Sequence, residues 1–117
     1  MGSTNVIAID DLDFDKMVLG AERPVLIKFS AQHCAPCRAL APIVDRIADE
    51  GGGKYQVFSV DIDKAPRIAT RYGIRAVPTL LAFHRGVPKG QLVGVASRDA
   101  VLKLLSAAGL CESLRQT

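Results

Sequence analysis

The 117-residue chain contains no tryptophan, and aromatic residues make up only 5% of it. No apolar stretch approaches the roughly 20 residues that a membrane-spanning helix needs. The net charge is only +3 and the basic residues are scattered, so neither nucleic acid nor an anionic membrane is an expected partner. The first residues lack a basic segment followed by an apolar run, so we expect a cytoplasmic protein, with a removed signal peptide as the alternative.

Cysteine is also scarce, with three residues in the chain. An odd number does not make the disulfide framework of a small secreted domain, and it fits one working pair plus a spare. The pair is Cys34-Ala35-Pro36-Cys37, and the spare is Cys111, which we expect to be an exposed thiol near the C-terminus. A zinc site is the competing interpretation of the pair, but zinc usually takes four ligands and no second pair is present. We therefore expect neither a metal nor a cofactor.

The hydrophobic content of 49% suits one domain, with residues 6–108 as its core. Local patterns predict strands at 6–9, 25–29, 55–60, 79–83 and 91–95, helices at 10–19, 38–50, 66–72 and 98–108, and a hairpin turn at 85–90. Parallel crossovers come first and an antiparallel hairpin last. This order predicts an α/β fold with a mixed five-stranded sheet and helices on both faces.

The cysteine pair falls where a strand gives way to a helix. At a helix N-terminus the free backbone N–H groups and the helix dipole stabilise an anion, so the pKa of the Cys34 thiol should be lowered. Helical spacing brings Cys37 to the same face, and Pro36 costs little in a first turn. We expect Cys34 to attack a disulfide and Cys37 to resolve the product.

This architecture and dithiol resemble the thioredoxin family along nearly the whole chain. The resemblance rests on residues 29–38 around the cysteines, 41–43 with 47–50, 60–63, 72–80 and 93–94. It implies the thioredoxin fold and a monomeric protein-disulfide oxidoreductase working through a Cys34 mixed disulfide. It also implies recharging by an NADPH-dependent thioredoxin reductase. A more oxidising exchanger or isomerase, and a redox-regulated binding module, are the alternatives.

The resemblance also changes the interpretation of two prolines. An X-Pro bond is cis in about one case in twenty, yet the matching proline of thioredoxins is cis beside the cysteines, so we expect a cis Pro78. Pro42 should bend its helix, as in the family, although a helix break is the alternative. The resemblance implies an apolar groove in which the Val77 backbone pairs with a substrate strand. Its expected residues are Ala35, Pro36, Val77, Pro78, Gly94 and Val95.

Several positions depart from the family. Ser30 and His33 replace tryptophans, and Ala35 replaces a glycine. A protonated His33 would lower the pKa of the Cys34 thiol further, although an exposed spacer is as good an interpretation.

The sharpest departure is Lys28, which replaces a buried aspartate that serves the resolving cysteine, while Ser59 replaces the lysine that commonly accompanies it. A protonated Lys28 would stabilise thiolates and make the disulfide more oxidising. A neutral Lys28 would instead be a base for Cys37. A lysine that only reaches solvent is the third interpretation.

Overall fold

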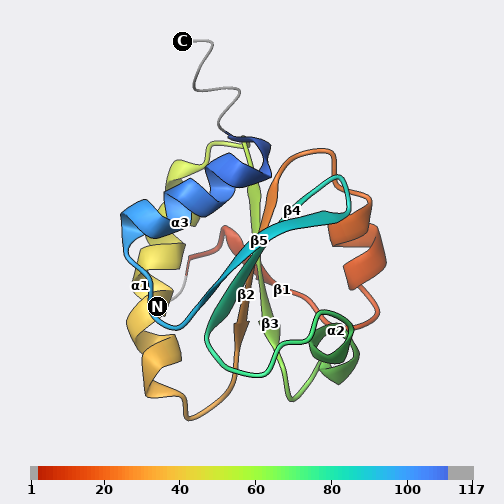
Figure 1. Cartoon of the computed structure of the whole chain (residues 1–117), viewed down its shortest axis with the longest axis vertical. Coiled ribbons are helices and arrows are strands. Elements are labelled where there is room, and N and C mark those ends of the chain that lie inside the picture. The colour runs from red at the N-terminus through yellow and green to blue at the C-terminus, as the bar shows by residue number, and fades with distance from the viewer. Residues whose placement is uncertain (1–2, 111–117) are drawn as a thin grey trace.

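Five strands form one mixed sheet in the order β1-β3-β2-β4-β5 in the computed structural model, which describes residues 3–110 (Figure 1). β1 and β2 run parallel to β3, whereas β4 runs antiparallel to both β2 and β5. The α/β class and the mixed five-stranded sheet are confirmed. The strands are β1 Val6–Ala8, β2 Val25–Ser30, β3 Gln56–Asp61, β4 Thr79–His84 and β5 Val87–Val93.

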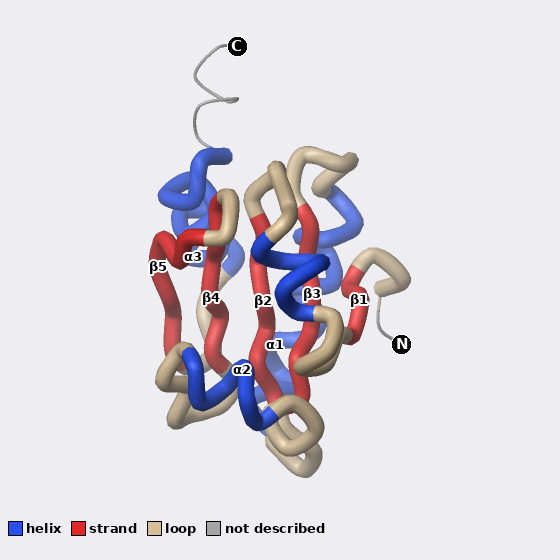
Figure 2. Tube along the Cα trace, turned by 90° about the vertical axis from the view of Figure 1, so that its right-hand side faces the viewer, coloured by secondary structure: helices blue, strands red, loops and turns tan. Residues whose placement is uncertain are grey.

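Helices cover both faces of the sheet, as the element order predicts (Figure 2). α1 and α3 pack on one face, and α2 packs on the other together with a π-helical turn, η1. The helical elements are η1 Asp15–Leu19, α1 Ala35–Glu50, α2 Pro66–Arg71, α3 Arg98–Leu105 and a second π-helical turn, η2 Ser106–Leu110. None of the helices within residues 3–110 is long and apolar enough to cross a membrane.

The central strand β2 is buried on both faces because its residues alternate between two cores. Val25, Ile27 and Phe29 belong to the core under α2. Leu26 belongs to the core under α1. Lys28 therefore points toward the α1 side, and it is half-buried where a continuous apolar strand would have a fully buried residue.

The structure corrects several expected boundaries, beginning with the hairpin and its second strand. The hairpin predicted at 85–90 is a tight turn at Arg85 and Gly86, whose φ angles of 52° and 82° suit a two-residue hairpin. β5 then begins at Val87 and ends at Val93, instead of occupying 91–95. Pro88 is tolerated there because β5 is an edge strand with a bulge opposite, at Ala82 and Phe83.

The predicted helix at 10–19 is also shorter, because the Asp10 carboxylate accepts hydrogen bonds from the N–H groups of Leu12 and Asp13 and so closes a turn. The helix predicted at 98–108 ends at Leu105, where η2 takes over. Ser97 caps this helix, since its Oγ accepts a hydrogen bond from the Ala100 N–H at 3.2 Å. Cys111 lies outside the described residues.

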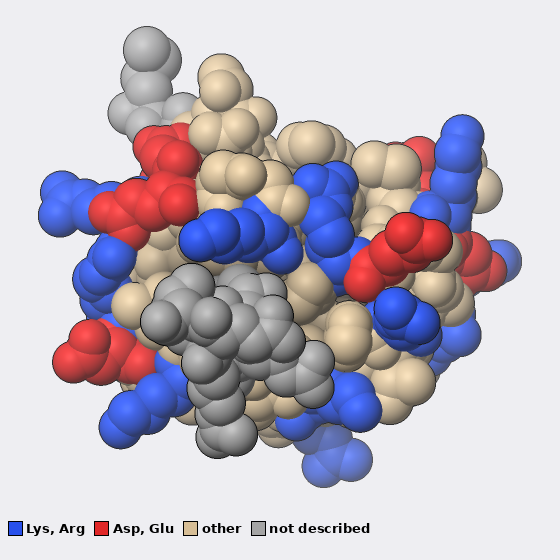
Figure 3. Space-filling view, turned by 90° about the horizontal axis from the view of Figure 1, so that it is seen from above, with Lys and Arg blue, Asp and Glu red and all other residues tan. Residues whose placement is uncertain are grey.

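The end of the molecule toward which α1 runs is shown in Figure 3. Lys and Arg side chains share this face with Asp and Glu side chains. The mixture agrees with the scattered charges of the sequence.

The first turn of α2 is held by a side chain from another part of the chain. Pro66 has no N–H, and the next two N–H groups, of Arg67 and Ile68, donate to the Asp11 carboxylate at 3.2 and 2.9 Å. An acceptor at this place satisfies helix-terminal donors that would otherwise lack a partner. Asp11 thus ties the loop after β1 to the helix that precedes the Val77 loop.

We expect Asp11→Ala to lower the free energy of unfolding by about 1–2 kcal/mol, the usual cost of losing such a cap. Asp11→Asn should lose less because its amide oxygen still accepts. Urea unfolding of both variants measures the effect. Asp63→Ala is the control, since that exposed carboxylate accepts no hydrogen bond among the described residues; equal losses in Asp11→Ala and Asp63→Ala would contradict the assignment.

Candidate active site

The two cysteines lie at the junction between β2 and α1, joined in a disulfide. Cys34 is the N-cap residue of α1, with extended φ and ψ angles of −111° and 104°. Its sulfur accepts a hydrogen bond from the Cys37 N–H at 3.2 Å. The helix predicted at 38–50 begins earlier, at Ala35, and the expected position of the cysteines at its N-terminus is confirmed. A Cys34 thiolate would meet the same N–H group and the positive end of the helix dipole.

The two cysteines differ in exposure. Cys37 is only 6% exposed, whereas Cys34 is half-buried. A second sulfur atom approaching from solvent therefore reaches Cys34 first.

His33 supplies the bend that leads into the helix. Its φ of 60° lies in the left-handed region, which His adopts more readily than bulky or branched residues. Its side chain is exposed. No local pattern predicts this backbone role, since neither glycine nor asparagine occupies the turn.

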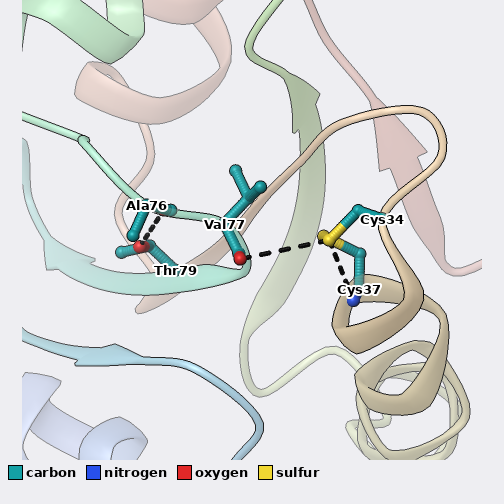
Figure 4. The surroundings of a disulfide bond; sticks show 5 residues. All are labelled: Cys34, Cys37, Ala76, Val77 and Thr79. Carbon is teal, nitrogen blue, oxygen red and sulfur yellow. Dashed lines mark hydrogen bonds between the residues drawn. A yellow bond between two sulfur atoms is a disulfide. The ribbon is translucent and has the colours of Figure 1, made fainter.

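The Val77 loop faces the cysteines from the other side (Figure 4). The Val77–Pro78 bond is cis, as the resemblance implied. The Val77 carbonyl oxygen lies 4.0 Å from Cys34 Sγ. A disulfide sulfur has no proton to give, so in this state the approach is a contact, whereas a Cys34 thiol would be able to donate to that oxygen.

Two hydrogen bonds fix the Val77 loop. The buried Thr79 hydroxyl donates to the Ala76 carbonyl at 2.7 Å. The Gly94 N–H donates to the Pro78 carbonyl at 2.8 Å, and the Gly94 φ of 92° requires a residue without a side chain. Among the described residues the Val77 N–H makes no backbone hydrogen bond, so it is available to an added strand.

The expected groove residues come from three segments, and of these the Val77 loop contacts Cys34 Sγ. Ala35 and Pro36 are exposed on the first turn of α1, and Val77 is half-buried. Pro78 is buried, so it offers a substrate less contact than the other expected groove residues. Val95 is 52% exposed just after Gly94, and Val93, which sequence reasoning missed, is 60% exposed. The position of Val93 at the end of the edge strand β5 could have indicated that its side chain is exposed.

Comparison with known proteins agrees with this arrangement. A sequence model of the family described as Thioredoxin matches residues 5–107. The chain belongs to the thioredoxin family. Among curated thioredoxin relatives, the chloroplastic thioredoxin M5 of Oryza sativa subsp. japonica is 41% identical over 100 residues, which cover 86% of this chain and 58% of that protein.

Two further thioredoxins show how much of a relative the chain spans. The chloroplastic M-type thioredoxin of Pisum sativum is 41% identical over 93 residues, 80% of this chain and 54% of that protein. The thioredoxin of Rickettsia felis is 39% identical over 94 residues, 80% of this chain and 90% of that protein. The chain thus spans just over half the length of these plant relatives and most of the bacterial one.

Pro42 lies inside α1 without ending it, because α1 is one helix from Ala35 to Glu50. The interpretation of Pro42 as a helix break is therefore wrong. The bend expected from thioredoxins stays a prediction.

A cavity of about 810 Å³ lies where this chain departs from the thioredoxin pattern. Lys28 and Ser59 line it from paired positions on β2 and β3. Arg38, Asp45, Arg46 and Asp49 line it from α1, and we call it the Lys28 cavity. Lys28 thus avoids full burial by reaching a space that is open to water, one of the three outcomes that its chemistry allows.

Metal-ligating side chains do not gather around the dithiol. Within residues 3–110, no group of three or more His, Cys, Asp or Glu side chains is placed to hold a metal ion. The zinc interpretation of the cysteine pair therefore lacks a ligand set in the described part of the chain.

The chain before β1 is attached to α1 at the edge of the Lys28 cavity. The Ser3 hydroxyl and the Asn5 side-chain amide, at 2.9 Å for the latter, both donate to the Asp49 carboxylate. These bonds hold the pKa of Asp49 below its usual value, Ser3 having the larger effect. A lowered folded pKa stabilises the attachment above the unfolded pKa, and this stabilisation is lost as pH falls through the folded pKa.

We therefore expect the attachment to hold at neutral pH and to loosen only below about pH 4. Ser3→Ala and Asn5→Ala should each raise the pKa of Asp49 toward its usual value, followed as the carboxyl-carbon chemical shift in an NMR titration. Thr4→Ala is the matched control, because the Thr4 side chain makes no hydrogen bond among the described residues. An unchanged Asp49 titration in both Ser3→Ala and Asn5→Ala would contradict the prediction.

Proposed function

We propose that the chain is a thiol-disulfide oxidoreductase that acts on protein disulfides through a Cys34 mixed disulfide. The observation that carries the proposal is the Cys34–Cys37 disulfide at the N-terminus of α1, facing the cis-proline loop. Membership of the thioredoxin family, whose members are protein-disulfide oxidoreductases, supports it.

In the reducing direction, the Cys34 thiolate attacks one sulfur of a substrate disulfide. A Cys34-substrate disulfide forms, and the other substrate sulfur leaves as a thiolate and takes up a proton. The Cys37 thiolate then attacks Cys34 Sγ, which closes the Cys34–Cys37 disulfide and releases the second substrate thiol. Two electrons pass from the dithiol to the substrate, and the reverse sequence oxidises a dithiol substrate.

The substrate segment is proposed to lie extended beside Val77, pairing with its backbone as an added strand. The free Val77 N–H supports this pairing, and the exposed side chains of Ala35, Pro36, Val93 and Val95 offer apolar contact on either side of it. Pro78 and Gly94 hold this loop by the hydrogen bond between them.

Other expectations about the cellular setting stay predictions. We propose a monomer that is recharged by an NADPH-dependent thioredoxin reductase when it works as a reductant. A cytoplasmic location is likewise proposed, as an alternative to the chloroplast for which several plant relatives are named.

Replacing Cys34 and replacing Cys37, each in a Cys111→Ser background, should give different kinetic defects. We expect Cys34→Ser to lower dithiothreitol-driven reduction of a protein disulfide to the uncatalysed rate. Cys37→Ser should still attack once and then accumulate the mixed disulfide, because nothing resolves it. Mass spectrometry of the trapped adduct and the steady-state rate measure these outcomes. Turnover that survives Cys34→Ser would favour the binding-module interpretation instead.

Lys28 is proposed to act as a charged group that modulates the dithiol, with His33 and Ser59 in lesser modulating roles. A protonated amine on the strand beneath α1 favours the thiolates, and so favours the reduced form. The half-buried position of Lys28 beside a water-accessible cavity supports retention of its charge. If Lys28 keeps its charge, the Cys34–Cys37 disulfide should be more oxidising than it would be with a neutral residue at position 28.

We expect Lys28→Met to lower the reduction potential of the Cys34–Cys37 pair, on the order of 10 to 30 mV, where about 30 mV corresponds to a tenfold change in the exchange equilibrium. Equilibration with defined glutathione ratios measures it. Lys103→Met, which removes an exposed lysine on α3, is the charge-matched control. An unchanged potential together with slower release of mixed disulfide would assign Lys28 the alternative role of a base for Cys37.

A further inference from the structure

The Lys28 cavity has an unusual floor for the covered face of a sheet. Lys28 and Ser59 are paired residues on neighbouring parallel strands, so their side chains point to the same face. The preceding pair on that face, Leu26 and Val57, is apolar and fully packed under α1. The α1-facing side of the sheet thus changes from a dry core to a polar floor within two residues.

The helix above the floor keeps the space open. Ala41 and Pro42 line the cavity with small side chains, and Arg38 and Arg46 stand one helical turn before and after Pro42. Long guanidinium groups therefore border the cavity on both sides of the gap above Lys28. The guanidinium fork matches the geometry of an oxyanion, and the ammonium of Lys28 adds a third positive charge.

These three cations form no ion pair with carboxylates of residues 3–110. The ion pairs among residues 3–110 are Arg71 with Asp15 at 3.2 Å and Arg98 with Glu50 at 2.5 Å, and neither involves the cavity cations. Asp49 lines the same space, but it accepts hydrogen bonds from Ser3 and Asn5. Asp45 is the other carboxylate in the lining, so the three cations outnumber the two anions.

The cavity is open to water, so an anion from solution can reach the half-buried Lys28, with which no carboxylate of residues 3–110 forms an ion pair. We propose that the Lys28 cavity binds a phosphate-type oxyanion, either free phosphate or the phosphate group of a small phosphomonoester. Lys28 and the two arginines supply the charge, and the Ser59 hydroxyl supplies a neutral donor. The cavity lining includes neither cysteine, so anion binding there needs no thiol chemistry, although Lys28 and Ser59 are shared with the proposed modulation of the dithiol.

The test is a titration of the full-length oxidised protein followed by amide NMR at pH 7.5. Sodium phosphate and glycerol 3-phosphate are the two probes, each at an ionic strength kept constant with sodium chloride. We expect saturable shifts confined to the amides around Lys28, Ser59 and Arg46. Saturation by phosphate alone identifies the free anion as the ligand, and saturation by the ester identifies a phosphomonoester.

Variants separate a built site from general attraction of anions. We expect Lys28→Met to weaken the apparent affinity at least tenfold and Ser59→Ala severalfold, with well-dispersed spectra showing that both remain folded. Lys103→Met is the charge-matched control and should bind as the unaltered chain does. Lys28→Gln repeats the test with a polar side chain, in case the methionine closes the cavity by packing into it.

Shifts that rise linearly without saturation, or that spread equally over exposed basic residues such as Lys103, would overturn the proposal. Equal affinity in Lys28→Met, Lys28→Gln and the unaltered chain would also overturn it. Cys34→Ser retains the cavity and should bind the anion unchanged. A failure of the anion site and a failure of the proposed oxidoreductase activity are therefore distinguishable.

Discussion

The hydrogen bond from the Cys37 N–H to Cys34 Sγ is the interaction on which the candidate site depends. It exists because Cys34 is the N-cap of α1, a position at which a side-chain acceptor is normally a serine or aspartate oxygen. Using sulfur there aligns the reactive atom with the helix dipole and with donors that have no other partner. The same geometry leaves Cys37 one turn later and buried, so a single backbone arrangement both exposes one sulfur and shields the other.

Other parts of the fold keep that arrangement in place. The left-handed His33 brings the chain from the end of β2 into α1. On the opposite side, Gly94 binds Pro78 and Thr79 binds Ala76, so the Val77 loop is attached both to the end of β5 and to its own turn. Asp11 anchors the helix that precedes this loop. The sulfur atoms thus lie between the capped N-terminus of α1 and a loop that hydrogen bonds hold on the opposite side.

Much of this could be predicted from the sequence, and the exceptions have physical causes. Buried strands and the long α1 follow from hydrophobic runs and periodicity, and the dithiol at the strand-helix junction follows from them. The start of β5 was missed because Pro88 and Gly90 are typical turn residues, and only the edge position of the strand makes them acceptable there. The cis bond at Pro78 was predictable only from the family resemblance, since an X-Pro bond is usually trans. The roles of His33 and Asp11 depend on backbone angles and on a contact across 57 residues of chain, which no local pattern encodes.

Lys28 shows how one substitution extends beyond its own position. A charged residue on a central strand requires water or an anion, so the residues above it must be small or polar. Ser59 beside it and Ala41 and Pro42 above it meet this requirement and leave a cavity where an apolar residue would be packed. The apolar contacts that hold α1 come from Leu40, Val44, Ile47 and Ala48, all of which lie after its first turn. The first turn, which carries the dithiol, depends instead on the Cys34 cap and the hydrogen bond between its two cysteines, so capping stabilises the reactive end of the helix while hydrophobic packing anchors the other.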